Sequence, residues 1–211
     1  MNKEEFIEAL KEIGIEITET QLKQLEQFYH LMLEWNEKIN LTRITEEKEV
    51  YLKHFYDSLT LNKVVNLKEI NTLCDVGTGA GFPGVVLKII FPNLKVTLID
   101  SLQKRVNYLN EVIKELNLKD IVAIHSRGED YKGQFDVVTS RAVANIEKLV
   151  DYTMHLVSKN GVFVAMKGNI EEELTETVEK RISHKYIIER IERFLLPIEN
   201  SQRSLILMKN K

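Results

Sequence analysis

Residues 70–84 read Ile70-Asn71-Thr72-Leu73-Cys74-Asp75-Val76-Gly77-Thr78-Gly79-Ala80-Gly81-Phe82-Pro83-Gly84. An apolar run short enough for a buried strand ends in an acid, then passes through a glycine-rich loop to a proline that suits the first turn of a helix. Glycines let a backbone approach a ligand closely, and the helix that follows presents free N–H groups. The stretch therefore predicts a strand, loop and helix unit that binds a nucleotide.

The next apolar run, residues 96–100, ends in a second acid, Asp100, 19 residues after Gly81. An acid at the tip of a second strand can accept hydrogen bonds from ribose hydroxyls. Residues 79–84 also satisfy the G-x-G-x-x-G pattern of NAD-binding folds, which alone is a weak signal. Asp75 ahead of the glycines, the tight Gly77-x-Gly79-x-Gly81 spacing and the lack of a second nucleotide-binding half favour S-adenosylmethionine (SAM). NAD is the alternative, and a purely structural turn is favoured least.

Composition indicates one sizeable core with a small appendage, because the chain has 211 residues, 44% of them hydrophobic and 29% charged. No apolar run is long enough to span a bilayer, and the first residues do not resemble a secretory signal. The one cysteine, Cys74, lies inside the predicted strand, where a buried hydrophobe is the favoured reading. We expect a cytoplasmic protein with no membrane partner and no bound metal.

The net charge of −3 argues against a nucleic-acid partner only until its distribution is considered. Residues 1–40 hold 4 Lys or Arg against 9 Asp or Glu, whereas residues 41–211 hold 25 against 23. The larger part of the chain is mildly basic, which leaves room for a local basic face.

Residues 1–62 are predicted to form an N-terminal helical extension, and residues 63–211 the catalytic domain. Helical spacing predicts a helix over residues 3–13 and a longer one after Thr18, where Thr18-x-x-Gln21 is a capping-box pattern. A third helix is expected over residues 45–61 with Thr45 as its cap.

His54, Asp57 and Ser58 stand at i, i+3 and i+4 of that third helix and share one face. Three neighbours on one helix cannot supply the nucleophile, base and orienting carboxylate of a hydrolase triad. A polar face turned toward the cofactor and a plain surface face both remain open.

From residue 70 onward strands alternate with helices, which implies a mostly parallel sheet covered on both sides. Further strands are expected at residues 96–100, 121–124, 135–140 and 162–166, and a hairpin from the runs 185–195 and 204–208. Helices are expected from about residue 84 to 91, after Ser101, from Asn145 to about 158, and over 169–182 with Asn169 as cap; Asn160-Gly161 is expected to turn. These elements predict an α/β fold with a seven-stranded, mostly parallel sheet closed by a C-terminal antiparallel hairpin. This is the arrangement of Rossmann-like class I SAM-dependent methyltransferases, so residues 63–211 are predicted to be a SAM-dependent methyltransferase domain.

Open parallel sheets bind ligands outside the carboxyl ends of their strands. These ends should bring together the loop from Asp75 to Phe82, Asp100, Gly128 with Glu129, Ser140 with Arg141, and Lys167.

Residues that are missing at the strand ends narrow the kinds of atom that could accept the methyl group. After the fourth strand the chain reads Thr139-Ser140-Arg141-Ala142-Val143-Ala144, without the Asn or Asp, prolines and aromatic of enzymes that methylate exocyclic amines. Methylation at carbon 5 of a pyrimidine needs a nucleophilic cysteine, and Cys74 lies too deep. A ring nitrogen or an oxygen is favoured.

Guanine N7 is one such acceptor, and because its lone pair is unprotonated at neutral pH, it needs no general base. Catalysis would rest on alignment and electrostatics. The deep major groove of A-form RNA hides N7, so the target must lie in a loop or be flipped out. Candidate phosphate or base contacts are Lys53, Arg43, Arg127, Lys167 and Arg203.

Four motifs carry a resemblance that runs over nearly the whole chain: Trp35-Asn36-x-x-x-Asn40-Leu41-Thr42, His54-Phe55-x-Asp57-Ser58-Leu59, the Asp75–Gly84 loop, and Ser140-Arg141-Ala142-Val143-Ala144; Lys167-Gly168 completes the set. With these motifs the chain resembles the bacterial glucose-inhibited-division-B family, 16S rRNA guanine-N7 methyltransferases.

The resemblance implies SAM as cofactor and 16S rRNA as partner, with the rRNA bound within the 30S subunit or its precursor. It implies cofactor contacts at Gly77, Phe82, Gly128, Glu129 and Arg141, with Asp100 on the ribose; Gly79 joins them from the loop. Arg141 could hold the cofactor carboxylate or donate to the base. Arg127-Gly128-Glu129 stands where an Ala-Glu pair is more usual. The residues expected to bind substrate are His54, Asp57, Ser58, Lys167 and Arg203, and no catalytic residue is assigned.

Two other functions stay open at this point. Residues 1–61 could form a lid over a small-molecule acceptor instead of a platform for RNA. The chain could also be a SAM-responsive ribosome assembly factor without catalytic activity.

Overall fold

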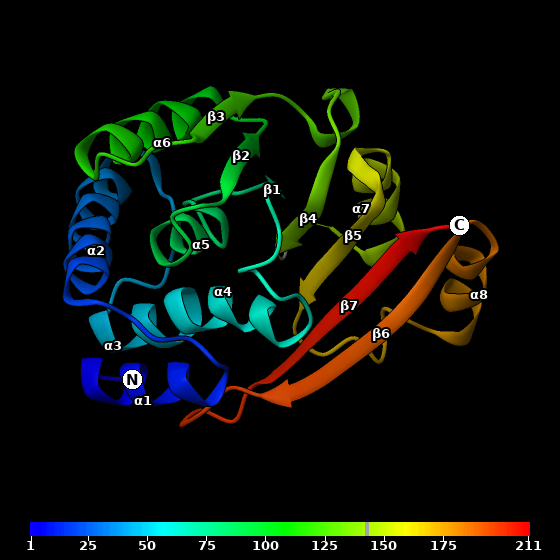
Figure 1. Cartoon of the computed structure of the whole chain (residues 1–211), viewed down its shortest axis with the longest axis horizontal. Coiled ribbons are helices and arrows are strands. Elements are labelled where there is room, and N and C mark those ends of the chain that lie inside the picture. Colours follow the sequence, from blue (N-terminus) through cyan, green and yellow to red (C-terminus); the bar gives the residue numbers. More distant parts are fainter. Residues whose placement is uncertain (142–143) are drawn as a thin grey trace.

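One seven-stranded sheet forms the centre of the computed structural model, which describes residues 1–141 and 144–211 (Figure 1). The strand order is β3-β2-β1-β4-β5-β7-β6. The strands are β1 Thr72–Val76, β2 Lys95–Asp100, β3 Ile121–His125, β4 Phe135–Arg141, β5 Val157–Lys167, β6 Tyr186–Leu195 and β7 Gln202–Asn210. β1 to β5 pair in parallel, and β7 pairs antiparallel with both β5 and β6. The predicted fold class and its C-terminal hairpin are confirmed.

The two faces of the sheet are covered by different helices, because side chains alternate along each strand. Leu73 of β1 packs into the core shared with the helices that precede α7, whereas Cys74 and Val76 pack toward α7 and α8. The longer helices are α1 Lys3–Glu12, α2 Glu19–Ile39, α5 Gly84–Ile90, α6 Gln103–Glu115, α7 Ile146–Thr153 and α8 Glu176–Lys185. In the described residues no helix combines the length and apolar character needed to cross a membrane.

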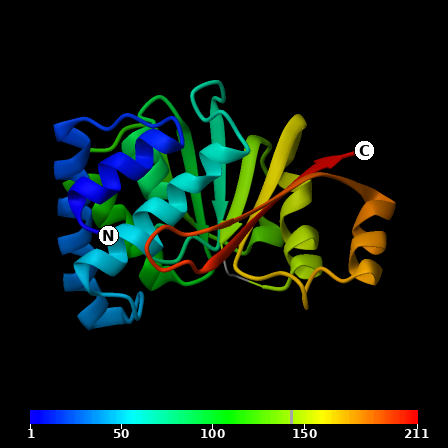
Figure 2. The same cartoon turned by 90° about the horizontal axis from the view of Figure 1, so that it is seen from below.

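The N-terminal helices pack against the sheet and its helices through one continuous core. Phe6 of α1 and Leu25 of α2 belong to the same buried cluster as Leu73 and Val137 of the sheet. The predicted capping box at α2 is confirmed, since Thr18 accepts from Gln21 N and Gln21 reaches back to Thr18 N. Figure 2 shows these helices gathered at one end of the molecule, with α8 at the other.

The third helical region is wound less regularly than expected. It consists of α3 Glu47–Val50, the π-helix η1 Tyr51–Tyr56, α4 Asp57–Leu59 and the 3₁₀ helix η2 Thr60–Lys63. Glu46, not Thr45, caps it, because the Glu46 carboxylate accepts from Glu49 N. The π-helix is a winding that occurs often at functional sites, and here it carries His54 toward the carboxyl ends of the strands.

Four further local predictions are wrong. The helix expected over 169–182 begins only at Glu176, because Ile170 is buried and Glu173 turns back to Lys167, so Thr175 becomes the cap. Ser101 does not cap α6; Leu102 N donates to Asp100 Oδ1 instead. α7 ends at Thr153 and is followed by the 3₁₀ helix η4 Met154–Leu156. Asn160-Gly161 lies inside β5, where the pairing with β4 shifts register.

Candidate active site

A cavity of about 430 Å³ opens at the carboxyl ends of β1, β4 and β5. Its walls come from the N-terminal helical region, the glycine loop, the strand ends and the C-terminal hairpin. The lining residues are Leu41, Thr42, Ile44, Lys53, His54, Asp57, Gly77, Thr78, Gly79, Ala80, Phe82, Arg141, Met166, Lys167, Gly168, Phe194, Arg203 and Leu205. A depression thus lies at the strand ends, but one side of it is built by segments outside the five parallel strands. The predicted strand-end residues that do not line it include Asp75, Asp100, Gly128, Glu129 and Ser140.

The glycine loop leaves β1 and forms the floor of this cavity. The backbone N–H groups of Gly77 and Thr78 donate to Ile99 O at 2.8 and 3.1 Å, which ties the loop to β2. Gly79 has φ +60°, and only Gly77 O lies within 4 Å of where its Cβ would stand. This bare, left-handed backbone leaves room for a ligand against the loop.

Asp75 lies beneath the loop with one oxygen satisfied. Its Oδ2 accepts from Gly84 N at 2.8 Å and so fastens the start of α5, while Oδ1 and the nearby Thr78 Oγ1 have no partner among the described residues. Burial raises the pKa of Asp75 to about 6, although the Thr78 hydroxyl and the Gly84 N–H oppose the shift. Thr78 lines the cavity, and its hydroxyl fits a ligand that brings hydrogen-bonding groups, as SAM does.

Asp100 ends β2 beside the same loop, as the sequence predicts. Its Oδ2 accepts from Gly79 N at 2.9 Å and its Oδ1 from Leu102 N at 2.9 Å. Arg105 Nη1 lies 3.4 Å from Oδ2. The carboxylate thus holds the glycine loop and the start of α6 together, and its role toward a ribose stays a prediction.

Gly128 and Glu129 follow β3 in the 3₁₀ helix η3 Gly128–Asp130, outside the lining of the cavity. A Cβ on Gly128 would stand 2.7 Å from Val76 Cγ1 and 3.1 Å from Tyr152 O, so no larger residue fits there without a shift. Glu129 is exposed and lies 3.9 Å from Arg127. Their contact with the cofactor stays a prediction.

Arg141, at the end of β4, has its guanidinium group fixed from three sides. Nη1 donates to Lys53 O at 2.8 Å and to Asp57 Oδ2 at 3.2 Å, and Nη2 lies 3.1 Å from His54 Nδ1. The group also lies 5.3 Å from the centre of the Phe82 ring, within reach of a cation–π interaction. Arg141 is therefore held in place before any ligand arrives.

His54 joins Arg141 to the end of the N-terminal helical region. An arginine can only donate, so Nδ1 of His54 accepts and Nε2 carries the proton, which it donates to Thr42 Oγ1 at 3.0 Å. Burial, and then the charge of Arg141, lower the pKa of His54 to about 3. The ring stacks on Phe82 with centroids 4.3 Å apart, so His54 is a neutral, positioned group.

Asp57 bridges two cations at the mouth of the cavity. Its Oδ2 accepts from Arg141, and its Oδ1 accepts from Nε of Arg203, on β7, at 3.0 Å. The cluster of one carboxylate and two guanidinium groups keeps a net positive charge. Ser58 does not join it, because its Oγ is buried and donates to His54 O.

Lys167 lies at the end of β5, and its charge is already engaged. Nζ donates to Glu173 Oε1 at 2.8 Å and to Ala144 O, and the side chain is 9% exposed. The Ser140–Ala144 motif contains residues 142–143, which lie outside the described residues. Its first member, Ser140, donates to Val76 O at 2.7 Å and links β4 to β1.

Of the other candidate cations, Lys53 is ion-paired, and two arginines are exposed. Lys53 lines the cavity and pairs with Glu49 at 2.7 Å and Glu199 at 3.3 Å; the hydrogen bond to Glu49 is the main cause that raises its pKa. Arg43 and Arg127 are exposed. Among the described residues no group of three or more His, Cys, Asp or Glu side chains is placed to hold a metal ion.

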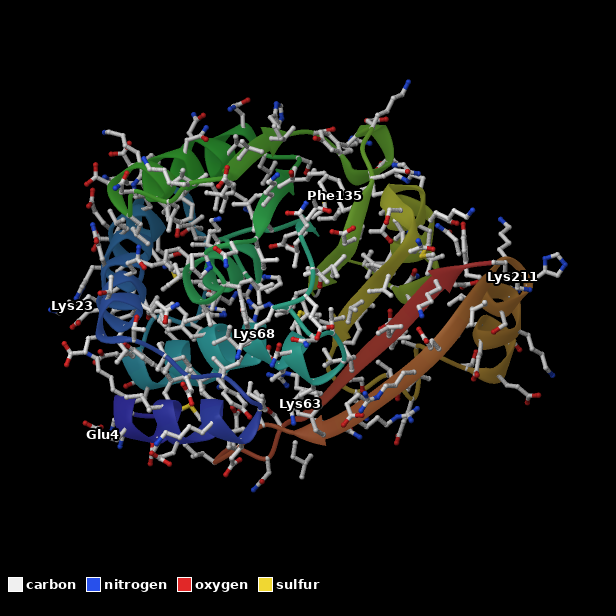
Figure 3. The ribbon with its side chains drawn as sticks, viewed as in Figure 1. Glu4, Lys23, Lys63, Lys68, Phe135 and Lys211 are labelled. Atoms are coloured by element: carbon white, nitrogen blue, oxygen red, sulfur yellow. The ribbon has the colours of Figure 1, made fainter. Side chains whose placement is uncertain are left out.

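Sequence reasoning did not assign several lining residues. Thr42 belongs to the Trp35–Thr42 motif, but the sequence assigned it no role. For Phe194, Leu205 and Met166 the sequence offers no indication of a site beyond their apolar character. The hairpin register brings Phe194 opposite Arg203, and that register is a tertiary property. Lys63, labelled in Figure 3, lies at the end of η2 with Nζ 5.0 Å from the Phe194 ring centre.

Comparisons with known proteins give a consistent result. The family model GidB, "rRNA small subunit methyltransferase G", matches residues 21–205. The ribosomal RNA small subunit methyltransferase G of Bacillus licheniformis is 46% identical over 220 residues, covering 100% of this chain and 91% of that protein. The protein of the same name from Listeria monocytogenes is 44% identical over 221 residues, covering 100% of this chain and 92% of that protein.

Solved structures bear on the fold alone. A SAM-dependent methyltransferase from Aquifex aeolicus superposes with a TM-score of 0.59 at 20% identity, covering 77% of this chain and 93% of that one. This similarity agrees with the class I methyltransferase topology of the sheet.

Proposed function

Because the chain belongs to the GidB family of rRNA small subunit methyltransferases G, we propose that it methylates N7 of one guanine in 16S rRNA, with SAM as the methyl donor. The observation that carries this proposal is the cavity that joins the glycine loop to the Asp57, Arg141 and Arg203 cluster. One end of the cavity suits a cofactor, and the other presents cations to a polyanion.

Residues around the glycine loop are proposed to bind the cofactor. Gly77, Gly79 and Asp100 border the loop, Gly128 and Glu129 extend the site past β3, and Phe82 with Arg141 close it on the cavity side. SAM, when bound, supplies a methyl group on a positively charged sulfur. The chain aligns that group with the acceptor and excludes water, which is how transfer without acid–base chemistry is accelerated.

Guanine N7 fits the chemistry of the described side chains because it has no proton to remove. His54 is the histidine that lines the cavity and would be the first candidate for a general base. It is neutral, but both of its ring nitrogens are engaged in hydrogen bonds to Arg141 and Thr42. Lys167 is engaged with Glu173. The site is therefore arranged for positioning, and no described lining residue stands free as a general base.

Substrate contacts are proposed for the positive end of the cavity. Arg203 and Lys167 have donors that can reach a phosphate or guanine O6, whereas bidentate donation to O6 and N7 would block the nucleophile. Asp57 and His54 act by holding Arg141, and Ser58 acts through the backbone of His54. Residues 1–62 are proposed as the extension that carries this wall, and residues 63–211 as the methyltransferase domain.

The form of the substrate is proposed to be the 30S subunit or its precursor, which places the reaction in the cytoplasm. Labelled SAM should be incubated with the protein and 30S subunits, naked 16S rRNA or a metabolite extract, and methylated nucleotides mapped by mass. The expected result is label in 16S rRNA as 7-methylguanosine. Label only in small molecules would indicate a small-molecule methyltransferase, and SAM binding with no label in any substrate would indicate a binding protein.

A further inference from the structure

The loop between β6 and β7, residues 196–201, projects past the carboxyl edge of the sheet on the side of the cavity. Lys167, the last residue of β5, pairs with Ser204 of β7, so everything before Ser204 on that strand lies beyond β5. Arg203, which lines the cavity, donates from Nη1 to Ser201 Oγ at 3.3 Å. The hairpin tip therefore borders the mouth of the cavity.

Ile198, at this tip, is exposed to solvent and has an unfavourable backbone conformation. Glu199 N donates to Pro197 O at 2.8 Å, which closes a three-residue turn around Ile198, whose φ is +69°. A γ-turn with positive φ at its centre is rare and strained, and a β-branched residue there is an outlier. Ile198 is 61% exposed, so packing compensates for little of the strain.

The rest of the loop is anchored, so the position of Ile198 is defined. Leu196 is fully buried, and its N donates to Ser201 O at 2.9 Å while its O accepts from Asn200 N at 3.0 Å. Glu199 lies 3.3 Å from Lys53, which lines the cavity. Figure 2 shows the hairpin loop beside the α3–α4 segment, in agreement with this ion pair.

The surroundings of Ile198 favour RNA over a protein partner. Arg203 and Lys53 stand at its base, Arg193 is exposed near the end of β6, and Leu195 beside the tip is 57% exposed. Two apolar side chains beside Arg193, Arg203 and the ion pair of Lys53 with Glu199 make a poor protein interface. They match proteins that insert an apolar side chain between bases.

We propose that Ile198 is an apolar wedge, which enters the base stack of the substrate RNA at the place that the target guanine leaves when it turns into the cavity. The inference rests on the proposed function, since it assumes an RNA substrate. It explains why a strained turn exposes an isoleucine beside the site: an extruded base leaves a gap, and an apolar side chain stabilises the unstacked neighbours.

The test uses Ile198→Asn, because asparagine accepts positive φ more readily than isoleucine. The variant should be at least as resistant to urea as the wild type and should bind SAM equally well by calorimetry. Its kcat/KM on RNA should fall by about tenfold or more, since unstacking a base is then uncompensated. Ile198→Met, which keeps an apolar side chain, should retain most of the activity.

Asn200→Gly is the matched control, because Asn200 lies in the same loop at φ +56° and carries no apolar group; its kcat/KM should equal that of the wild type. A second readout uses RNA with 2-aminopurine at the target position. Saturating wild-type protein should raise its fluorescence by unstacking it, and Ile198→Asn should raise it less.

Several outcomes would overturn the wedge. Ile198→Asn could keep both kcat/KM and the fluorescence rise, or Asn200→Gly could lose as much activity as Ile198→Asn. A loss on 30S subunits without a loss on naked RNA would assign the tip to a ribosomal protein instead. Failure of the proposed function is distinct from all of these, because the wild-type protein would then label no RNA.

Discussion

Asp57 offsets part of the positive charge that faces the cavity. It joins Arg141 and Arg203, which lie on β4 and β7, and its side chain is 8% exposed. Two guanidinium groups placed side by side without it would repel, whereas with it they leave one net charge. That balance keeps both arginines ordered, and under the proposed function the remaining charge would attract a phosphate or a carbonyl oxygen.

Two buried groups give the free energy of unfolding opposite pH dependences. Folding lowers the pKa of His54 from 6.5 to about 3 and raises that of Asp75 from 3.8 to about 6. Between pH 4 and 6, unfolding therefore binds a proton at His54, which makes stability rise with pH. It releases a proton at Asp75, which makes stability fall. Each slope is about 1.4 kcal/mol per pH unit, so they nearly cancel.

His54→Gln should expose the slope of Asp75. Its stability is expected to fall by about 1.4 kcal/mol for each pH unit between pH 4 and 6, while the wild type stays nearly flat. Urea unfolding at several pH values in this window measures both. His30→Gln, on an exposed histidine, should follow the wild type. A flat profile for His54→Gln would show that Asp75 is ionised in the folded chain.

Asp100→Ala should weaken SAM binding by about 1–3 kcal/mol, because hydrogen bonds to the ribose would be lost. Part of the loss is expected through the glycine loop, which Asp100 holds by Gly79 N. Calorimetry measures the affinity directly, and Asp151→Ala, on the exposed side of α7, is the control. Unchanged affinity would place the ribose away from the end of β2.

At the scale of elements, Gln21 serves two helices at once. Its Oε1 accepts from Thr18 N at 2.9 Å at the start of α2, and its Nε2 donates to Ile89 O and Ile90 O at the end of α5. One side chain thus satisfies backbone groups that both helix ends would otherwise leave unpaired. It also joins the N-terminal helices to the helix that follows the glycine loop.

Gln21→Ala should therefore lower the free energy of unfolding by about 1–2 kcal/mol, measured by urea titration. Gln27→Ala is the control from the same helix, because Gln27 makes one exposed hydrogen bond to Glu115 O; its cost should stay within about 0.5 kcal/mol. Equal effects for the two variants would mean that the contact between α2 and α5 adds nothing to stability.

The elements that local sequence determines were predictable. Thr18 and Asn145 cap their helices as expected, and most strands begin and end within a few residues of their predicted places. The exception is β5, which begins at Val157 and not at residue 162. The errors lie where distant contacts decide. Ile170 is drawn into the core, Glu173 into an ion pair with Lys167, and the helix expected at residue 169 begins at Glu176.

At the scale of the molecule, the site was only half predictable for a physical reason. The ends of parallel strands must meet at one edge, so Asp75, Asp100, Arg141 and Lys167 could be placed together from sequence. The partners of Arg141 could not, because His54 reaches it from a π-helix. Arg203 joins the cluster only through Asp57, and an antiparallel register brings it there. Neither feature has a local sequence signal.

The shared core predicts that the N-terminal helices and the sheet unfold together. Trp35 is the one tryptophan, and its ring lies 5.8 Å from that of Tyr108 on α6, across the predicted boundary at residue 62. Urea transitions followed by Trp35 fluorescence and by far-UV circular dichroism should coincide.

SAM should shift both of these transitions equally, by about 2.7 kcal/mol at a concentration of one hundred times Kd. The reason is that Phe82, on the glycine loop, packs against Phe28 of α2 with ring centres 5.3 Å apart. A ligand on the loop therefore stabilises the helices as well. An earlier fluorescence transition that ignores SAM would instead make residues 1–62 an independently folding unit, and the RNA-side wall would then form only after the two parts dock.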